Sequence, residues 1–216
     1  AKHAEKSEAE FKAMLDWALR VIVLVGVPSS LAMLILAEPM IAALFHHGKF
    51  SANDVAMSAA ALQALSGGIL AFMLIKVFAP GYYSRQDTKT PVKIGIIAMI
   101  SNMAFNLMLV WHFKHVGLAF ASTMSAFLNA GLLYHGLHKQ NVFRLEKHWR
   151  VLALRYGFAN IAMVAVLLVI TPSLAFWLDA NALHKVAYLL AICLAGVVTY
   201  LVALTLTGFK WRELKH

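Results

Sequence analysis

The sequence predicts an all-α membrane protein with six transmembrane helices. Of its 216 residues, 61% are hydrophobic, and the mean hydropathy is +0.72, whereas a soluble domain of this size is usually about half apolar. The apolar residues gather in six blocks, each near the roughly 20 residues that a helix needs to cross the hydrocarbon of a bilayer. The blocks do not alternate between apolar and polar residues, as the strands of a membrane β-barrel would. The predicted spans are about 17–37, 54–79, 91–111, 116–137, 150–177 and 183–208.

Lysine and arginine are distributed unevenly between the segments that connect these spans. The chain carries 19 Lys and Arg against 10 Asp and Glu, a formal charge of +9. If the N-terminus is cytoplasmic, fifteen of these cations lie on the inner side, and three (Lys49, Lys114 and Lys185) lie on the outer side. Short cytoplasmic loops are enriched in Lys and Arg, so we expect both termini on the cytoplasmic side. Topology therefore explains the basic composition, and no nucleic-acid partner is expected.

The first span contains a helix-breaking run near its middle. Gly26 and Pro28 precede two serines, and proline removes a backbone donor from a helix. We expect a kink there and take Gly26 and Pro28 as hinge candidates, because broken helices often border the path of a transported substrate. Kinks are as common in ordinary helix bundles, so both interpretations stay open.

The outer segment that follows, EPMIAALFHHGKFSANDVA, leads into the second span. It holds a short apolar piece from Pro39 to Phe45. Ser51 and Asp54 form the pattern of a capping box that opens the second helix, with Asp in place of the usual Glu. His46 and His47 are adjacent and point apart on regular structure, so we interpret them as interfacial residues, not metal ligands.

Polar residues inside the second and third spans are the candidates for a substrate path, because such residues are costly in a membrane. Lys76 lies about one turn from the inner end of its span, where it either reaches the headgroups or faces a cavity and meets an anionic substrate. Asn102 and Asn106 share one face of the third span and either bond to neighbouring helices or line a wet cavity. Gln63 is open to the same two interpretations.

The charged segment APGYYSRQDTKTPVKIG, residues 79–95, joins the second and third spans on the inner side. Pro80 and Gly81 are expected to end one helix, since proline lacks a donor and glycine permits a turn. Thr90 is expected to be the N-cap of the next helix, with Pro91 as its first residue. Two further residues complete this cytoplasmic hairpin: the cation Arg85, and Asp87, which can bond backbone amides or pair with a neighbouring cation.

The last three spans offer packing features and no catalytic pattern. The fourth carries a stripe of small residues, Ser122, Ala126 and Ala130, that permits close helix contact. Cys193 in the sixth is expected to be a small buried residue. The sequence contains no Walker A, GxSxG, HExxH or CxxC motif and no dinucleotide-binding glycine pattern. We therefore expect no catalytic residue, no cofactor and no metal.

Two segments carry a resemblance to a known family. The run APGYYSRQDTKTPVKIG resembles the inner hairpin of the MurJ (MviN) lipid II flippases, in which an aromatic pair precedes an Asp-Thr-x-Thr-Pro element. The outer segment EPMIAALFHHGKFSANDVA is similar to the family's Phe-x-x-Gly-x-Phe pattern followed by Ser or Thr and an acid, and the kinked first span also fits. The resemblance extends along essentially the whole chain and favours an enterobacterial member.

The resemblance implies that residues 1–216 are the C-terminal lobe of a 14-helix, two-lobed transporter of the multidrug/oligosaccharidyl-lipid/polysaccharide exporter superfamily. Such a protein flips undecaprenyl-diphosphate-linked peptidoglycan precursor from the cytoplasmic to the periplasmic leaflet of the bacterial inner membrane by alternating access. The last two helices of the family form a groove suited to the lipid tail. The family's cationic cavity residues lie largely in the N-terminal lobe, which this sequence lacks. This half therefore offers as cavity candidates only Lys76, Gln63, Asn102 and Asn106.

Two other functions remain open. An exporter of drugs or polysaccharides from the same superfamily would need aromatic or acidic contacts in the cavity, and the second to fourth spans hold no acid at mid-membrane. A non-transporting membrane scaffold would lack a water-filled cavity, and its asparagines would be fully paired between helices. The sequence begins AKHAEKSEAE, without methionine, so we expect either a processed product or, preferably, part of a longer protein whose N-terminal lobe is its partner.

Overall fold

The computed structural model describes residues 2–46, 49–140, 142 and 148–209, with side chains from residue 10 onward. Within that part of the chain every regular element is a helix, which confirms the all-α prediction. The helices are α1 (Lys2–Phe45), α2 (Ala52–Ser66), α3 (Gly68–Tyr83), α4 (Lys89–Lys139), α5 (His148–Ile170), α6 (Leu174–Asp179) and α7 (Ala182–Leu206). Only Gly67 separates α2 from α3, and its φ and ψ are still helical.

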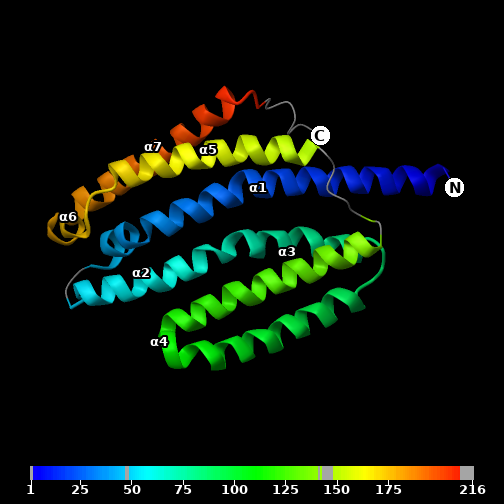
Figure 1. Cartoon of the computed structure of the whole chain (residues 1–216), viewed down its shortest axis with the longest axis horizontal. Helices are drawn as coiled ribbons and strands as arrows, with labels where there is room; N and C mark the ends of the chain where they lie inside the picture. The colour runs from blue at the N-terminus through cyan, green and yellow to red at the C-terminus, as the bar shows by residue number, and fades with distance from the viewer. Residues whose placement is uncertain (1, 47–48, 141, 143–147, 210–216) are drawn as a thin grey trace.

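Among the described residues, five segments are long and apolar enough to cross a membrane, and one of them, α4, is long enough to do so twice. The segments are α1, α2 with α3, α4, α5 and α7. As one straight helix α4 would extend roughly 75 Å at 1.5 Å per residue, but its backbone is not helical at Lys114 (φ 50°, ψ −129°). Figure 1 shows that α4 consists of two antiparallel halves that return to the same end of the molecule. The five segments thus form six helical rods of membrane length, which is the number that the sequence predicts.

The central element is α1. It packs against α2 and α3 on one side and against α5, α6 and α7 on the other, while α4 packs mainly on α2 and α3. Figure 1 shows α1 running between these two groups of helices. The N-terminus and both ends of α4 lie at one end of the molecule, and α6 and the turn within α4 lie at the opposite end.

Two apolar cores flank α1. The first joins it to α5, α6 and α7, and includes Leu24 of α1 and the fully buried Trp177 of α6. The second joins it to α3 and α4 around Leu19, Tyr82 and Leu133. Because lipid tails are as apolar as these side chains, tight van der Waals packing, and not exclusion of water, holds such helices together.

Helix α1 passes through both of its prolines. Pro28 and Pro39 lie inside the helix, so the piece from Pro39 to Phe45 belongs to α1 and is not the separate segment that the sequence predicts. A proline removes one hydrogen bond from the helix and pushes against the carbonyl four residues earlier. Packing against helices on both sides offsets that cost here.

The inner hairpin begins later than the sequence predicts. Helix α3 continues through Pro80 and Gly81, so the prediction that these residues end the helix is wrong. Proline costs the helix only one hydrogen bond, and Gly81 packs against α4. The turn comes at Gln86, which has a left-handed φ of 60°, and the Asp87 amide then donates to the Tyr82 carbonyl at 3.1 Å.

Helix α4 begins earlier than predicted, at Lys89. Thr90 and Pro91 therefore lie inside its first turn, and the prediction of Thr90 as N-cap is wrong. Thr88 occupies the cap position, but its side chain makes no capping bond. Instead Asp87 Oδ1 accepts the Thr90 amide at 3.0 Å, which satisfies one of the amides that a helix start leaves free.

Two further helix ends test the sequence patterns. The capping box of α2 is confirmed, since the Ser51 amide donates to Asp54 Oδ2 at 2.9 Å and the Asp54 amide donates to Ser51 Oγ at 3.3 Å. The fifth span differs from its predicted range of 150–177. Helix α5 ends at Ile170, and Pro172 lies between it and the short helix α6; here the proline does interrupt the helix, since it lacks a backbone donor and disfavours the helical conformation of the residue before it.

Candidate functional site

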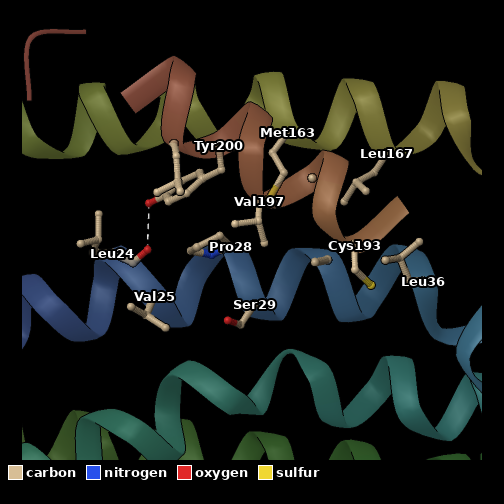
Figure 2. A pocket seen from close by; sticks show the side chains of 13 residues that line it. Leu24, Val25, Pro28, Ser29, Leu36, Met163, Leu167, Cys193, Val197 and Tyr200 are labelled. Carbon is tan, nitrogen blue, oxygen red and sulfur yellow. Dashed lines mark hydrogen bonds between the residues drawn. The ribbon is translucent and has the colours of Figure 1, made fainter. Parts of the chain in front are cut away.

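An apolar groove of about 410 Å³ lies between α1, α5 and α7 (Figure 2). Its walls include Leu24, Pro28 and Leu36 of α1, Met163 and Leu167 of α5, and Cys193, Val197 and Tyr200 of α7. Hydrocarbon dominates this lining, so the groove suits an apolar chain better than a polar headgroup. The α1 wall from Leu24 to Leu36 runs roughly 18 Å at 1.5 Å per residue, more than half the thickness of a bilayer core.

One buried hydrogen bond joins two walls of this groove. The Tyr200 hydroxyl of α7 donates to the main-chain carbonyl of Leu24 in α1 at 2.8 Å (Figure 2). Pro28 lies four residues after Leu24 and has no N–H to donate back to it. Tyr200 therefore satisfies a carbonyl that α1 itself leaves free.

Hydroxyl groups surround the junction between α2 and α3. Ser30 of α1 donates to the Ser66 carbonyl at 2.5 Å. Thr123 of α4 donates to the Ala64 carbonyl at 2.7 Å. Ser66 itself donates to the Gln63 carbonyl at 2.7 Å. Three carbonyls in the last turn of α2 are thus satisfied by side chains from three helices, which stabilises a helix junction at membrane depth.

Two of the cavity candidates lie on α2 and α3. The Gln63 side-chain amide donates to the Leu34 carbonyl of α1 at 3.2 Å. Lys76 is exposed on α3. Neither side chain lines the apolar groove.

The other two candidates form a short polar chain within α4. Asn106 donates to Asn102 Oδ1 at 3.0 Å, and Asn102 donates to Ser125 Oγ in the second half of α4 at 3.3 Å. Asn106 Oδ1 is buried and has no hydrogen-bond partner. Of the four candidates, the structure therefore joins Asn102 to Asn106 and places Gln63 against α1.

Polar residues stabilise the hairpin between α3 and α4. Hydrogen bonds from Thr90 lower the pKa of Asp87, with smaller contributions from the Lys89 amide and the charge of Lys93. Arg85 lies 3.5 Å from the Gln140 side-chain oxygen, which links the hairpin to the end of α4. Of the two predicted roles for Asp87, a bond to backbone amides and a pair with a neighbouring cation, the structure shows the bond to a backbone amide.

Comparison with known proteins identifies the family. Residues 1–190 match the sequence model of the family described as "Lipid II flippase MurJ". The chain belongs to the MurJ family.

Curated MurJ relatives match almost the whole chain. It is 42% identical over 214 residues to the "Probable lipid II flippase MurJ" of Vibrio cholerae and 44% identical over 209 residues to the protein of that name in Haemophilus influenzae. These matches cover 99% and 97% of this chain but 41% of each relative. The chain therefore spans about two fifths of the length of the relatives it matches.

A solved MurJ structure has the same fold. The chain matches "Lipid II flippase MurJ, inward closed conformation" with a TM-score of 0.72 and 20% identity, over 95% of this chain and 40% of the other. Together with the five apolar segments, the MurJ relatives indicate a multi-pass protein of the inner membrane.

At the end of the bundle that holds the α3–α4 hairpin (Figure 1), an ion cluster links α1 to α5. Arg20 and Asp16 form an ion pair at 2.6 Å, and the Trp149 indole donates to the other oxygen of Asp16 at 2.7 Å. His148 Nε2 lies 2.8 Å from the Arg20 guanidinium. The sequence gives no sign that these distant segments meet.

A buried lysine at the opposite end of the bundle, near the start of α7, was also missed. Lys185 is only 3% exposed, and its Nζ lies 3.3 Å from His46 Nδ1 and donates to the Leu178 carbonyl at 3.4 Å. His47 lies outside the described residues. Among the described residues no three His, Cys, Asp or Glu side chains form a group that could hold a metal ion.

Proposed function

We propose that this chain is the C-terminal lobe of a two-lobed transporter that flips lipid II from the cytoplasmic to the periplasmic leaflet for cell wall synthesis. The observation that carries the proposal is the family match along residues 1–190, together with the groove between α1, α5 and α7. The missing N-terminal lobe and membrane lipids are its partners, and both termini of this chain face the cytoplasm. No covalent step is involved, so the protein is a transporter and not an enzyme.

The groove is proposed to hold the undecaprenyl tail. Its lining is mostly of Leu, Val, Ala, Met and Pro side chains, with Ser29 at its α1 wall, and the Tyr200 hydroxyl is already bonded to the Leu24 carbonyl, so a hydrocarbon chain there covers little polar surface. A tail in this groove stays at the depth of the lipid hydrocarbon throughout transport. Only the headgroup then needs a polar path.

The headgroup is proposed to pass the polar faces of α2, α3 and α4. Diphosphate carries negative charge, and a charged group is costly to move through hydrocarbon. Lys76 supplies a cation on that path, while Gln63, Asn102 and Asn106 supply hydrogen bonds. The unpartnered Asn106 Oδ1 supports this assignment, because a buried acceptor without a partner costs free energy unless a ligand or water satisfies it.

Alternating access needs an element that changes shape, and α1 is proposed to be that element. It lies between the two groups of helices and carries Gly26 and Pro28 at its middle. Gly26 packs closely against α3, where an added Cβ would lie 3.1 Å from the Met73 sulfur. Movement at Gly26 and Pro28 would therefore shift both cores.

A drug or polysaccharide exporter is the alternative function, and a non-transporting scaffold is a further one. An exporter would transport substrates without a polyprenyl tail and would not depend on the groove. A scaffold would move nothing. Transport of purified lipid II separates all three.

The experiment measures lipid II flipping by the full-length protein, both in proteoliposomes and by complementation of a strain depleted of its own flippase. Lys76→Ala is expected to slow flipping about tenfold, as loss of one hydrogen bond to a charged group would. Lys76→Arg keeps the charge and is expected to retain most of the rate. Lys89→Ala, which removes an exposed hairpin lysine, is the matched control.

Absence of lipid II flipping by the intact protein would overturn the proposed function. A normal rate for Lys76→Ala would leave the function in place and reduce Lys76 to an anchor at the membrane interface.

A further inference from the structure

The point where α1 lacks a hydrogen bond lies in the wall of the groove. We call Leu24 and Pro28 the proline site of α1. Pro28 is buried, and both residues line the groove. A free carbonyl within hydrocarbon costs several kcal/mol, so the proline site needs an outside donor.

Tyr200 is that donor, and it belongs to a different helix. Its hydroxyl reaches the Leu24 carbonyl from α7, as Figure 2 shows, while its ring lines the same groove. Tyr200 is 6% exposed, so no water competes for this bond. The ring, the proline and the bond thus border one apolar space.

We propose that Tyr200 is a positioning residue that couples occupancy of the groove to the conformation of α1 at the proline site. The proposal rests on the proposed function in one respect, namely that a polyprenyl chain occupies the groove. A chain lying there touches Tyr200 and Pro28 directly. When α1 moves against α7, the Tyr200–Leu24 bond either breaks or Tyr200 moves with α1. Binding of the polyprenyl chain and movement of the helix therefore influence each other.

The first test is a stability cycle that needs no transport. Tyr200→Phe removes the hydroxyl and is expected to lower the melting temperature of the full-length protein by roughly 1–2 °C, since the shift per kcal/mol falls with chain length. Pro28→Ala restores an N–H to α1, which then bonds Leu24 internally. The loss caused by Tyr200→Phe is therefore expected to shrink strongly in the Pro28→Ala background.

Tyr82→Phe is the matched control for this cycle. Tyr82 donates a similar buried bond to the Leu133 carbonyl at 2.7 Å, but in the other core, away from the groove. The loss caused by Tyr82→Phe is expected to be the same in the natural and the Pro28→Ala backgrounds. Equal losses for Tyr200→Phe in the two backgrounds would overturn the assignment of Tyr200 to the proline site.

The second test measures coupling to the groove. Cys193 lines the groove and is the only cysteine of this chain, so undecaprenyl phosphate in the groove should protect it from N-ethylmaleimide once other cysteines of the full-length protein are replaced. Pro28→Ala and the double variant with Tyr200→Phe are expected to change the protecting concentration at least fivefold, within the usual range of coupling between sites. Tyr82→Phe is expected to leave it unchanged.

If Tyr200 has only a structural role, Tyr200→Phe costs little stability in the Pro28→Ala background, but undecaprenyl phosphate protects Cys193 at the same concentration in the variants as in the natural protein. That result would overturn the coupling. Failure of undecaprenyl phosphate to protect Cys193 in the natural protein would overturn it as well. Failure to flip lipid II, with protection and coupling intact, would instead count against the proposed function alone.

Discussion

Two buried tyrosines show how single residues join helices in this protein. Tyr82 and Tyr200 each place a hydroxyl on a main-chain carbonyl of another segment, at 2.7 and 2.8 Å. In hydrocarbon such bonds contribute about 0.6–2 kcal/mol each. They also fix the distance between two helices, because the ring is rigid and packed on its sides.

Gly136 is the residue that permits the Tyr82 bond. A Cβ at this position would collide with Tyr82 Oη, whereas a Cβ at Gly131, on the same half of α4, would meet nothing within 4 Å. Gly136→Ala is therefore expected to destabilise the full-length protein by about 1–3 kcal/mol, as overpacking does. Gly131→Ala is expected to be neutral or slightly stabilising, because alanine favours the helix. Thermal unfolding in detergent measures both, and equal effects would contradict the packing described for Tyr82.

Asp87 makes the inner hairpin sensitive to acid. Its folded pKa is lowered by the Thr90 hydrogen bonds, so its ionised form stabilises the hairpin at pH values above the unfolded pKa of about 3.9. That contribution is lost as the pH falls through the lowered folded pKa. Asp87→Ala is expected to be less stable than the natural protein at pH 7, and the difference should shrink progressively below about pH 3.9. Unfolding curves of both proteins from pH 7 to pH 3 measure this, and a difference independent of pH would exclude the carboxylate as its source.

Sequence patterns predicted local residue roles better than distant ones. The capping box of Ser51 and Asp54 was predictable because its two members are three positions apart. The Tyr200–Leu24 bond spans 176 positions. Pro28 predicts that the Leu24 carbonyl lacks a partner within α1, but the sequence does not indicate which residue donates to it. The burial of Lys185 could not be read from the sequence, because it depends on how α6 and α7 fold back on α1.

At the scale of elements, α1 and α4 organise the bundle. The central α1 touches both groups of helices, and α4 folds on itself at Lys114. The sequence predicted six helical rods of membrane length, because apolar block length follows from bilayer thickness. Helix ends were less predictable. Prolines 39 and 80 were expected to interrupt helices and do not, since packing against neighbouring helices offsets one lost hydrogen bond.

The α2–α3 junction depends on a hydroxyl from another helix. Thr123→Val keeps the shape of the side chain but removes the donor to the Ala64 carbonyl, so we expect a loss of about 0.6–2 kcal/mol. Thr205→Val is the control, because that exposed hydroxyl binds a carbonyl of its own helix α7. Chemical denaturation of the full-length protein in micelles compares the two. A larger loss for Thr205→Val would show that the junction does not rely on Thr123.

At the scale of the whole molecule, the fold and the charges agree. The six crossings place the N-terminus and both ends of α4 at one end of the molecule (Figure 1). The segments at this end carry most of the Lys and Arg, whereas Lys49 and Lys114 lie at turns and Lys185 lies near the start of α7, at the other end. The polar candidates were predictable as residue types, but their arrangement was not, because a headgroup path that involves the N-terminal lobe cannot be read from one lobe.

The orientation of the lobe in the membrane can be tested by labelling residues in its connections. In cells, a membrane-impermeant thiol reagent is expected to label Lys49→Cys from the periplasm and Arg85→Cys only after the inner membrane is opened, because positive loops stay in the cytoplasm. Lys114→Cys should behave like Lys49→Cys, since the reversal of α4 puts that turn at the outer end. Labelling of Lys49→Cys and Arg85→Cys from the same side would contradict the six crossings. Labelling from opposite sides in the reverse sense would keep the crossings and invert the lobe, which would place the diphosphate path and the hairpin cations on the wrong side for export.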